Sequence, residues 1–286
     1  MKMWVTGSLG MLGSSIVSLL EKRKIPFFAT DKMDADITDF AKLASFSEKK
    51  YFTHIINCAA YTNVEKAEKE KELAFQTNAK GVQNLALLAK ERKAKLVHFS
   101  TDYVFDGRKR SPYVEEDLPN PLNEYGKSKL KGEEYILSLL EDALILRTSW
   151  LFGLGGMNFV TKMLHNMEER KEIEIVEDQI GRPTCCSDLA EALLLLISER
   201  GIFHFANREA TSWYLFGKTI WEETNKMGFS LRCEKIVPVK SVSKINRPLY
   251  SVLATDKAER ILGGKLKDWQ TLLPAYLMEL RKCLCR

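Results

Sequence analysis

The chain carries a tyrosine and a lysine four residues apart, Tyr125 and Lys129, in the stretch Tyr-Gly-Lys-Ser-Lys. Residues four apart share one face of an α-helix, so the phenol and the ammonium can point into one pocket. A neighbouring cation favours phenolate, and we expect Lys129 to lower the pKa of Tyr125 from its usual value of about 10. Such a tyrosine can give a proton to a carbonyl oxygen while hydride arrives at the carbon. On an exposed helix the pair would be two solvated side chains without a catalytic role. The residues around the pair determine which interpretation is correct.

A glycine-rich segment near the N-terminus could bind the hydride carrier. Gly7, Gly10 and Gly13 follow an apolar strand and open a helix. Glycines allow a tight turn and close approach of a phosphate, and the helix N-terminus offers free N–H groups to it. The spacing GxxGxxG differs from the commoner GxGxxG fingerprint. We expect a dinucleotide site, with a plain turn before a helix as the alternative.

The end of the second expected strand bears on the identity of the cofactor. Asp31 stands there, and an acid in this place can accept hydrogen bonds from the adenosine ribose, which favours NAD. Lys32 beside it could instead pair with the 2′-phosphate of NADP, so NADP and NAD both stay open. The segment 36–39, with Asp36 and Ile37, could contact adenine or form a helix N-cap.

Thr101 could supply a second hydrogen bond to the same carbonyl. It follows the apolar run 95–100, and the carboxyl ends of parallel strands line the ligand crevice of a doubly wound sheet. The alternative is a polar turn, signalled by the nearby Asp106-Gly107 pair.

These residues depend on alternating strands and helices. Expected strands span residues 1–6, 25–30, 54–60, 95–100 and 143–147, and expected helices span 14–22, 66–92 and 123–140. Near-continuous apolar strands that alternate with helices indicate a parallel sheet covered on both faces. The predicted class is α/β, a doubly wound, Rossmann-like fold.

The rhythm changes after about residue 150. We therefore predict an NAD(P)-binding domain over residues 1–150 and a smaller substrate-binding lobe over 151–286, partly interleaved with the first. Expected strands in the second part are 172–176 and 201–205, and expected helices are 189–198, 215–227, 258–262 and 269–284. The segment 231–253 is expected to be irregular.

Composition excludes several classes of protein. The 286 residues are 45% hydrophobic, which is ample for a large core. The net charge is +5, but basic residues alternate with acids, as over 65–72, which indicates solvated helix faces and no nucleic-acid partner. Six cysteines without a CxxC pair and four scattered histidines predict no metal site.

Neither a signal peptide nor a membrane-spanning run is expected, so we predict a cytoplasmic protein without membrane contact; a homodimer is one possible assembly.

Several stretches together resemble the dTDP-4-dehydrorhamnose reductase family, in the extended branch of the short-chain dehydrogenase/reductase superfamily. The resemblance runs from the first strand to about residue 262. It rests mainly on residues 100–107, 120–129 and 147–153, with weaker support from 57–65, 178–184 and 247–251.

The resemblance implies roles for individual residues. The catalytic set would be Thr101, Tyr125 and Lys129: Tyr125 gives a proton to the 4-keto oxygen, Lys129 lowers its pKa and binds the nicotinamide ribose, and Thr101 polarises the carbonyl. With the residues argued above, the predicted cofactor site comprises Gly7, Gly10, Met11, Leu12, Gly13, Asp31, Lys32, Asp36, Ile37, Ala59, Ala60, Tyr61, Asn78, Tyr125 and Lys129. The predicted substrate site comprises Asp102, Tyr103, Trp150 and Arg182.

Two of the chain's arginines leave alternatives open. Arg147 and Arg182 could bind a diphosphate, which suits a planar guanidinium, or form structural ion pairs. Three places depart from the family's pattern: Glu65 replaces the usual Asp, Tyr250 the usual Asn, and Arg208-Glu209 a small turn. The last two fall in the expected substrate lobe and leave the sugar and its nucleotide open.

The implied activity is NAD(P)H-dependent reduction of the 4-keto group of a dTDP-linked 6-deoxyhexose, giving dTDP-L-rhamnose or a close analogue. The partner is then a nucleotide-sugar substrate. Two alternatives are kept: reduction of another nucleotide-linked 4-keto sugar, and a non-catalytic NADP-binding regulatory subunit.

Overall fold

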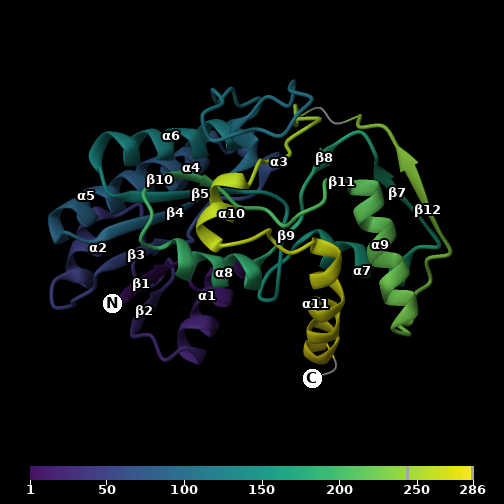
Figure 1. Cartoon of the computed structure of the whole chain (residues 1–286), viewed down its shortest axis with the longest axis horizontal. Helices are drawn as coiled ribbons and strands as arrows, with labels where there is room; N and C mark the ends of the chain where they lie inside the picture. The colour runs from purple at the N-terminus through teal and green to yellow at the C-terminus, as the bar shows by residue number, and fades with distance from the viewer. Residues whose placement is uncertain (243–244, 285–286) are drawn as a thin grey trace.

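A six-stranded parallel sheet forms the centre of the larger part of the molecule (Figure 1). The computed structural model describes residues 1–242 and 245–284. The strand order is β10-β5-β4-β3-β1-β2, and every neighbouring pair is parallel. The strands are β1 (Met3–Thr6), β2 (Phe27–Thr30), β3 (His54–Asn57), β4 (Lys95–Thr101), β5 (Ala143–Thr148) and β10 (Gly201–His204). The expected doubly wound, Rossmann-like α/β class is confirmed.

Helices cover both faces of this sheet (Figure 1). One face packs against α1 (Met11–Lys22), α8 (Cys186–Leu196) and α10 (Asp256–Leu262), and the other against α2 (Phe40–Ser47), α5 (Val82–Arg92) and α6 (Glu124–Leu139). Successive side chains of a strand point to opposite faces. In β1, Met3 and Val5 accordingly enter one buried cluster and Trp4 the other.

The long helix expected over 66–92 is divided. It consists of α3 (Val64–Ala67), α4 (Lys71–Phe75), a π-helical turn (Gln76–Gly81) and α5. Such turns often mark places where a helix is adapted to a site. Here the turn contains the fully buried Asn78, whose amide accepts from the backbone N–H of Tyr61 at 2.8 Å and donates to its carbonyl at 2.9 Å. The interruption therefore fixes the loop that follows β3.

The C-terminal part forms a second, smaller core. It contains α7 (Phe159–Glu169), α9 (Trp213–Lys226), α11 (Trp269–Leu284) and the strand β7 (Glu172–Val176). Two short strand pairs lie within the same half of the chain: β6 (Leu151–Phe152) with β9 (Thr184–Cys185), and β8 (Ile180–Gly181) with β11 (Thr211–Ser212).

The prediction that 231–253 is irregular is wrong for one segment. β12 (Lys235–Val239) runs parallel to β7, at the right of Figure 1. Pro238 disguised this strand, since proline cannot donate to a ladder. It is accommodated because β12 and β7 form a two-stranded ribbon, so each strand has a free edge. Residues 243–244 of the same segment lie outside the described residues.

Strand β10 comes from the second half of the chain but belongs to the main sheet. It pairs with β5, residue Gly201 opposite Leu144 and His204 opposite Arg147. The first domain's sheet is thus completed by residues 201–204. Among the residues described, no helix combines the length and apolar character needed to cross a membrane.

Candidate active site

The glycine turn joins β1 to α1, and the backbone packs so tightly there that side chains would clash. Gly7 has φ +64°, and Gly10 donates its N–H to the Gly7 carbonyl at 3.2 Å. A Cβ on Gly13 would lie 2.1 Å from that same carbonyl oxygen, so only glycine fits. No side chain caps the start of α1 at Gly10. The first N–H groups of the helix are therefore free, and the glycines let a ligand come close to the backbone there. This arrangement suits a pyrophosphate.

A cleft of about 530 Å³ opens beside this turn. Most of the predicted cofactor residues line it, namely Gly7, Gly10, Asp31, Lys32, Asp36, Ile37, Ala59, Ala60 and Tyr61. Met11, Leu12, Gly13, Asn78, Tyr125 and Lys129 do not line it. Further lining residues that the sequence did not single out are Leu9, Ala35, Thr38, Cys58, Leu73, Gln76 and Thr77. The cleft thus follows the carboxyl ends of β1, β2 and β3, where a doubly wound fold binds its ligands.

Acidic side chains shape the outer end of the cleft. The Asp31 carboxylate accepts the backbone N–H of Leu9 at 3.1 Å and of Lys32 at 2.7 Å, which ties the end of β2 to the glycine turn. Asp36 accepts the N–H and hydroxyl of Thr38. Both interpretations of segment 36–39 have support, since Asp36 and Ile37 line the cleft while Asp39 caps α2.

Tyr125 and Lys129 lie on α6, which starts beside the end of β4. Asn123 caps the helix by accepting from the Gly126 N–H at 2.9 Å. A Cβ on Gly126 would lie 2.2 Å from the carbonyl oxygen of Tyr103, so the glycine lets α6 approach the segment after β4. This approach brings Tyr125 into hydrogen-bonding contact with Thr101.

The expected lowering of the Tyr125 pKa is not found. Desolvation raises the pKa of Tyr125 to about 12, the hydrogen-bonding contact with Thr101 opposes this rise, and the charge of Asp102 adds to it. Lys129 is not among these causes, and its Nζ turns to the Phe99 carbonyl at 2.6 Å and to His98 Nε2 at 3.2 Å. Burial lowers the pKa of Lys129 itself to about 8.

Asp102, predicted near the sugar, turns its carboxylate into the protein. The side chain is 2% exposed, and its two oxygens accept from Thr101 Oγ1 at 3.1 Å and Ser251 Oγ at 2.5 Å. Burial raises the pKa of Asp102 to about 7. The neighbouring Tyr103 packs its ring edge-on against Tyr125, 5.9 Å between centroids. Asp102 therefore links the segment after β4 to the C-terminal motif that contains Ser251.

Trp150 is held in an unusual backbone conformation. Its φ is +46°, and its indole stacks on Trp213 with centroids 3.5 Å apart and planes 9° apart. A Cβ on Gly181 would meet the indole at 2.5 Å. One face and one edge of Trp150 are thus occupied, which fixes the ring and leaves it only partly exposed.

Arg182 uses its guanidinium within the chain. Nη1 donates to the Leu253 carbonyl at 2.9 Å and lies 3.4 Å from Thr255 Oγ1, while burial lowers its pKa. Arg147, the other arginine considered for a diphosphate, is 1% exposed and forms a bidentate ion pair with Glu133, 2.6 Å at the shorter contact. The ion-pair interpretation is therefore the correct one for Arg147.

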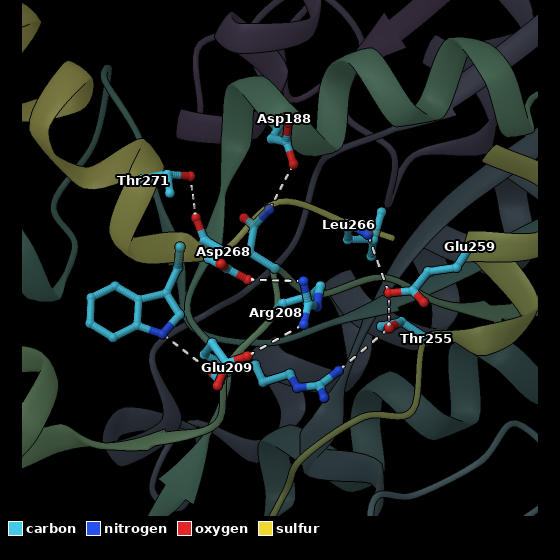
Figure 2. A network of polar contacts seen from close by, with 11 residues as sticks. Asp188, Arg208, Glu209, Thr255, Glu259, Leu266, Asp268 and Thr271 are labelled. Atoms are coloured by element: carbon cyan, nitrogen blue, oxygen red, sulfur yellow. Dashed lines mark hydrogen bonds and ion pairs between the residues drawn. The ribbon is translucent and has the colours of Figure 1, made fainter. Parts of the chain in front are cut away.

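The Arg208-Glu209 departure belongs to a polar network that Figure 2 shows from close by. Arg208 lies 3.4 Å from the Asp268 carboxylate and 3.6 Å from that of Glu209. In the same network Glu259 accepts from the Thr255 hydroxyl at 3.2 Å. These contacts tie the chain after β10 to the start of α11, which gives the two residues a structural task.

Sequence reasoning missed Glu133, which anchors α6, the helix that bears Tyr125 and Lys129, to the neighbouring strands. It accepts from Arg147 and also from the hydroxyl of Ser100 on β4. Its spacing was a usable signal, because Tyr125, Lys129 and Glu133 follow each other at intervals of four and share one helix face. Buried His98 was also missed, and no short-range pattern marks it.

The fold and the site together define a Rossmann-like, NAD(P)-dependent oxidoreductase. A family model described as the RmlD substrate binding domain matches residues 1–282. The chain is 37% identical to the dTDP-4-dehydrorhamnose reductase of Aggregatibacter actinomycetemcomitans, over 95% of this chain and 97% of that protein. It is 36% identical to the dTDP-4-keto-6-deoxy-D-glucose reductase of Streptomyces niveus, over 94% of both.

A solved structure agrees with these relatives. The dTDP-4-dehydrorhamnose reductase of Bacillus anthracis, in complex with NADP, superposes with a TM-score of 0.91 at 36% identity, over 97% of this chain and 99% of that one. The chain belongs to the dTDP-4-dehydrorhamnose reductase family.

Proposed function

We propose that the protein reduces the 4-keto group of a dTDP-linked 6-deoxyhexose with hydride from NADPH or NADH, giving dTDP-L-rhamnose or a close analogue. The observation that carries the proposal is the contact of Tyr125 with Thr101 at the end of β4, the strand next to β3, with Lys129 on the same helix face as Tyr125. The names of the relatives supply the class of sugar.

The described residues fit the dinucleotide. The glycine turn, where Gly13 admits no side chain, would hold the pyrophosphate at the start of α1. Asp31 would accept the hydroxyls of the adenosine ribose, and Lys129 would bind the nicotinamide ribose. When bound, the cofactor supplies the hydride.

The protein's own residues would supply the proton. The Tyr125 hydroxyl would donate to the 4-keto oxygen as negative charge develops there, and Thr101 would donate a second hydrogen bond to that oxygen. Because the hydroxyl of Tyr125 is desolvated, its pKa of about 12 keeps it protonated and able to donate at neutral pH. The partly exposed indole of Trp150 would pack against the deoxysugar, whose apolar face suits an aromatic ring.

The test is a reductase assay on the purified chain. NADPH or NADH is mixed with dTDP-4-keto-6-deoxy sugars and absorbance is followed, with product identified by NMR. Tyr125→Phe should lose several orders of magnitude in turnover while it still binds NADP. No oxidation with any 4-keto nucleotide sugar would refute the proposal.

The product separates two close alternatives. The Streptomyces niveus relative is named for a keto-deoxyglucose, so a dTDP-linked 6-deoxyhexose other than rhamnose is the second candidate. A regulatory subunit without activity is disfavoured by the Thr101–Tyr125 pair, since binding alone needs no proton donor. Cytoplasmic location, assembly as a homodimer and the absence of a nucleic-acid partner remain predictions.

A further inference from the structure

Lys129 is the end of a buried chain of hydrogen bonds that crosses the sheet. Thr6 donates its hydroxyl to Asn57 Oδ1 at 2.8 Å, Asn57 Nδ2 lies 2.9 Å from His98 Nδ1, and His98 Nε2 lies 3.2 Å from Lys129 Nζ. The four side chains are at most 2% exposed, on β1, β3, β4 and α6. Water therefore does not complete the contacts of this chain.

The direction of this chain follows from its first members. Asn57 Oδ1 also accepts the backbone N–H of Ala59 at 3.1 Å, and a backbone amide can only donate. The carboxamide cannot be turned over, because its NH₂ group would then face that N–H. Asn57 Nδ2 consequently donates to His98 Nδ1, which must be unprotonated.

The state of His98 then constrains Lys129. Burial is the largest cause that lowers the pKa of His98 well below its usual value, so the ring is neutral. A neutral imidazole with a bare Nδ1 carries its proton on Nε2. That N–H points at Lys129 Nζ, and only an uncharged amine has a lone pair to accept it. Lys129 can still donate to the Phe99 carbonyl at 2.6 Å.

We propose that His98 is a positioning residue that biases Lys129 toward the neutral amine in the cofactor-free enzyme and holds it away from Tyr125. The proposal deepens the proposed function, because it concerns the lysine expected to assist Tyr125. It agrees with the position of Lys129 Nζ, which lies against His98 Nε2 and the Phe99 carbonyl. The amine would gain its proton on leaving His98, which makes the assistance conditional on the position of Lys129.

Other charged groups near Lys129 act in the opposite sense. Glu133, one turn further along α6, and Cys58, just after β3, both raise the pKa of Lys129, while burial is the larger effect and lowers it to about 8. With all these effects the pKa of Lys129 lies about one unit above neutral pH, so a bias of about tenfold from His98 decides between amine and ammonium.

The tautomer of His98 can be read directly by nitrogen NMR. The cofactor-free full-length chain is labelled with ¹⁵N-histidine, and His98→Gln identifies the signals of His98 among the four histidines. We expect a protonated Nε2 and a bare Nδ1 throughout pH 6–9. A protonated Nδ1, or a ring protonated at both nitrogens, would overturn the proposal.

A second variant should reverse the direction of donation in the hydrogen bonds on both sides of the His98 ring. In Asn57→Asp a carboxylate accepts from Nδ1–H, so Nε2 becomes bare and can accept from an ammonium. The pKa of Lys129, followed by ¹³C at Cε, should rise by about one unit or more, a tenfold change in the amine-to-ammonium ratio. Thr6→Val is the matched control: Ala59 still fixes the carboxamide, so tautomer and pKa should stay as in the parent.

If Asn57→Asp does not fold, His98→Gln decides, since its carbonyl can accept from the ammonium and should also raise the pKa of Lys129. An unchanged Lys129 pKa in every folded variant of Asn57 or His98 would refute the proposal. These measurements need neither cofactor nor sugar, so a failed reductase assay would refute the proposed function without bearing on them.

Discussion

Replacing Asp102 by asparagine should make the protein more stable at alkaline pH. The carboxyl group is buried, and burial raises its pKa from 3.8 to about 7. Unfolding exposes the group and releases its proton wherever the pH lies between these two values. The unfolded state then binds fewer protons than the folded state, so stability falls as pH rises through this window.

The magnitude follows from the difference between the two pKa values. A pKa unit corresponds to about 1.36 kcal/mol, so the ionised carboxylate destabilises the folded state by about 4 kcal/mol above pH 7. The asparagine side chain would carry no such charge, but one hydrogen bond from Thr101 or Ser251 becomes less favourable, at about 1 kcal/mol. Asp102→Asn should therefore be slightly less stable than the parent at pH 4 and about 3 kcal/mol more stable at pH 8.

Urea unfolding of parent and variant, followed by circular dichroism at four pH values from 4 to 8, measures this difference. Other titrating groups are common to both proteins and cancel. Ser251→Ala is a useful companion: its hydroxyl lowers the pKa of Asp102, so its loss should move the pH-dependent window upward. A parent-to-variant difference that stays constant from pH 4 to 8 would refute the argument that the Asp102 carboxyl is protonated by burial.

Three further predictions concern packing. Arg147→Met should lower the free energy of unfolding by about 3–5 kcal/mol, since it leaves the Glu133 carboxylate buried without its partner, and the double replacement with Glu133→Leu should recover much of that loss in the same unfolding assay. Gly13→Ala should weaken NADP binding at least tenfold by calorimetry, because the methyl group would displace the turn that faces the pyrophosphate; unchanged affinity would contradict the placement of the cofactor. Gly181→Ala should displace the indole of Trp150 and raise KM for the sugar more than it lowers kcat, whereas a loss confined to kcat would argue against sugar packing on that ring.

What the sequence could predict was local. The glycine turn, the strand that precedes it and the helix that follows are contiguous, and their side-chain pattern determines them without help from the rest of the chain. The same holds for the spacing of Tyr125 and Lys129 on α6. The parallel sheet followed from apolar strands that alternate with helices.

What it could not predict depended on distant partners. Asp102 meets Ser251, 149 positions away, and this contact helps to bury a carboxyl group whose burial the sequence did not indicate. Lys129 meets His98 across two elements, which removed the expected effect on Tyr125. β12 escaped detection because its regularity comes from pairing with β7, and Pro238 masks it.

The late position of β10 has a consequence for how the chain folds as it is synthesised. The sheet that carries the cofactor cleft is not closed until residues 201–204 have left the ribosome, because they alone cover the edge of β5. From the emergence of β5 until then, a nascent chain that grows from about 150 to about 200 residues exposes an unpaired apolar edge strand, which invites association with other chains. The N-terminal half therefore matures only after part of the second half exists, and a gene cut at residue 150 would encode an aggregation-prone fragment.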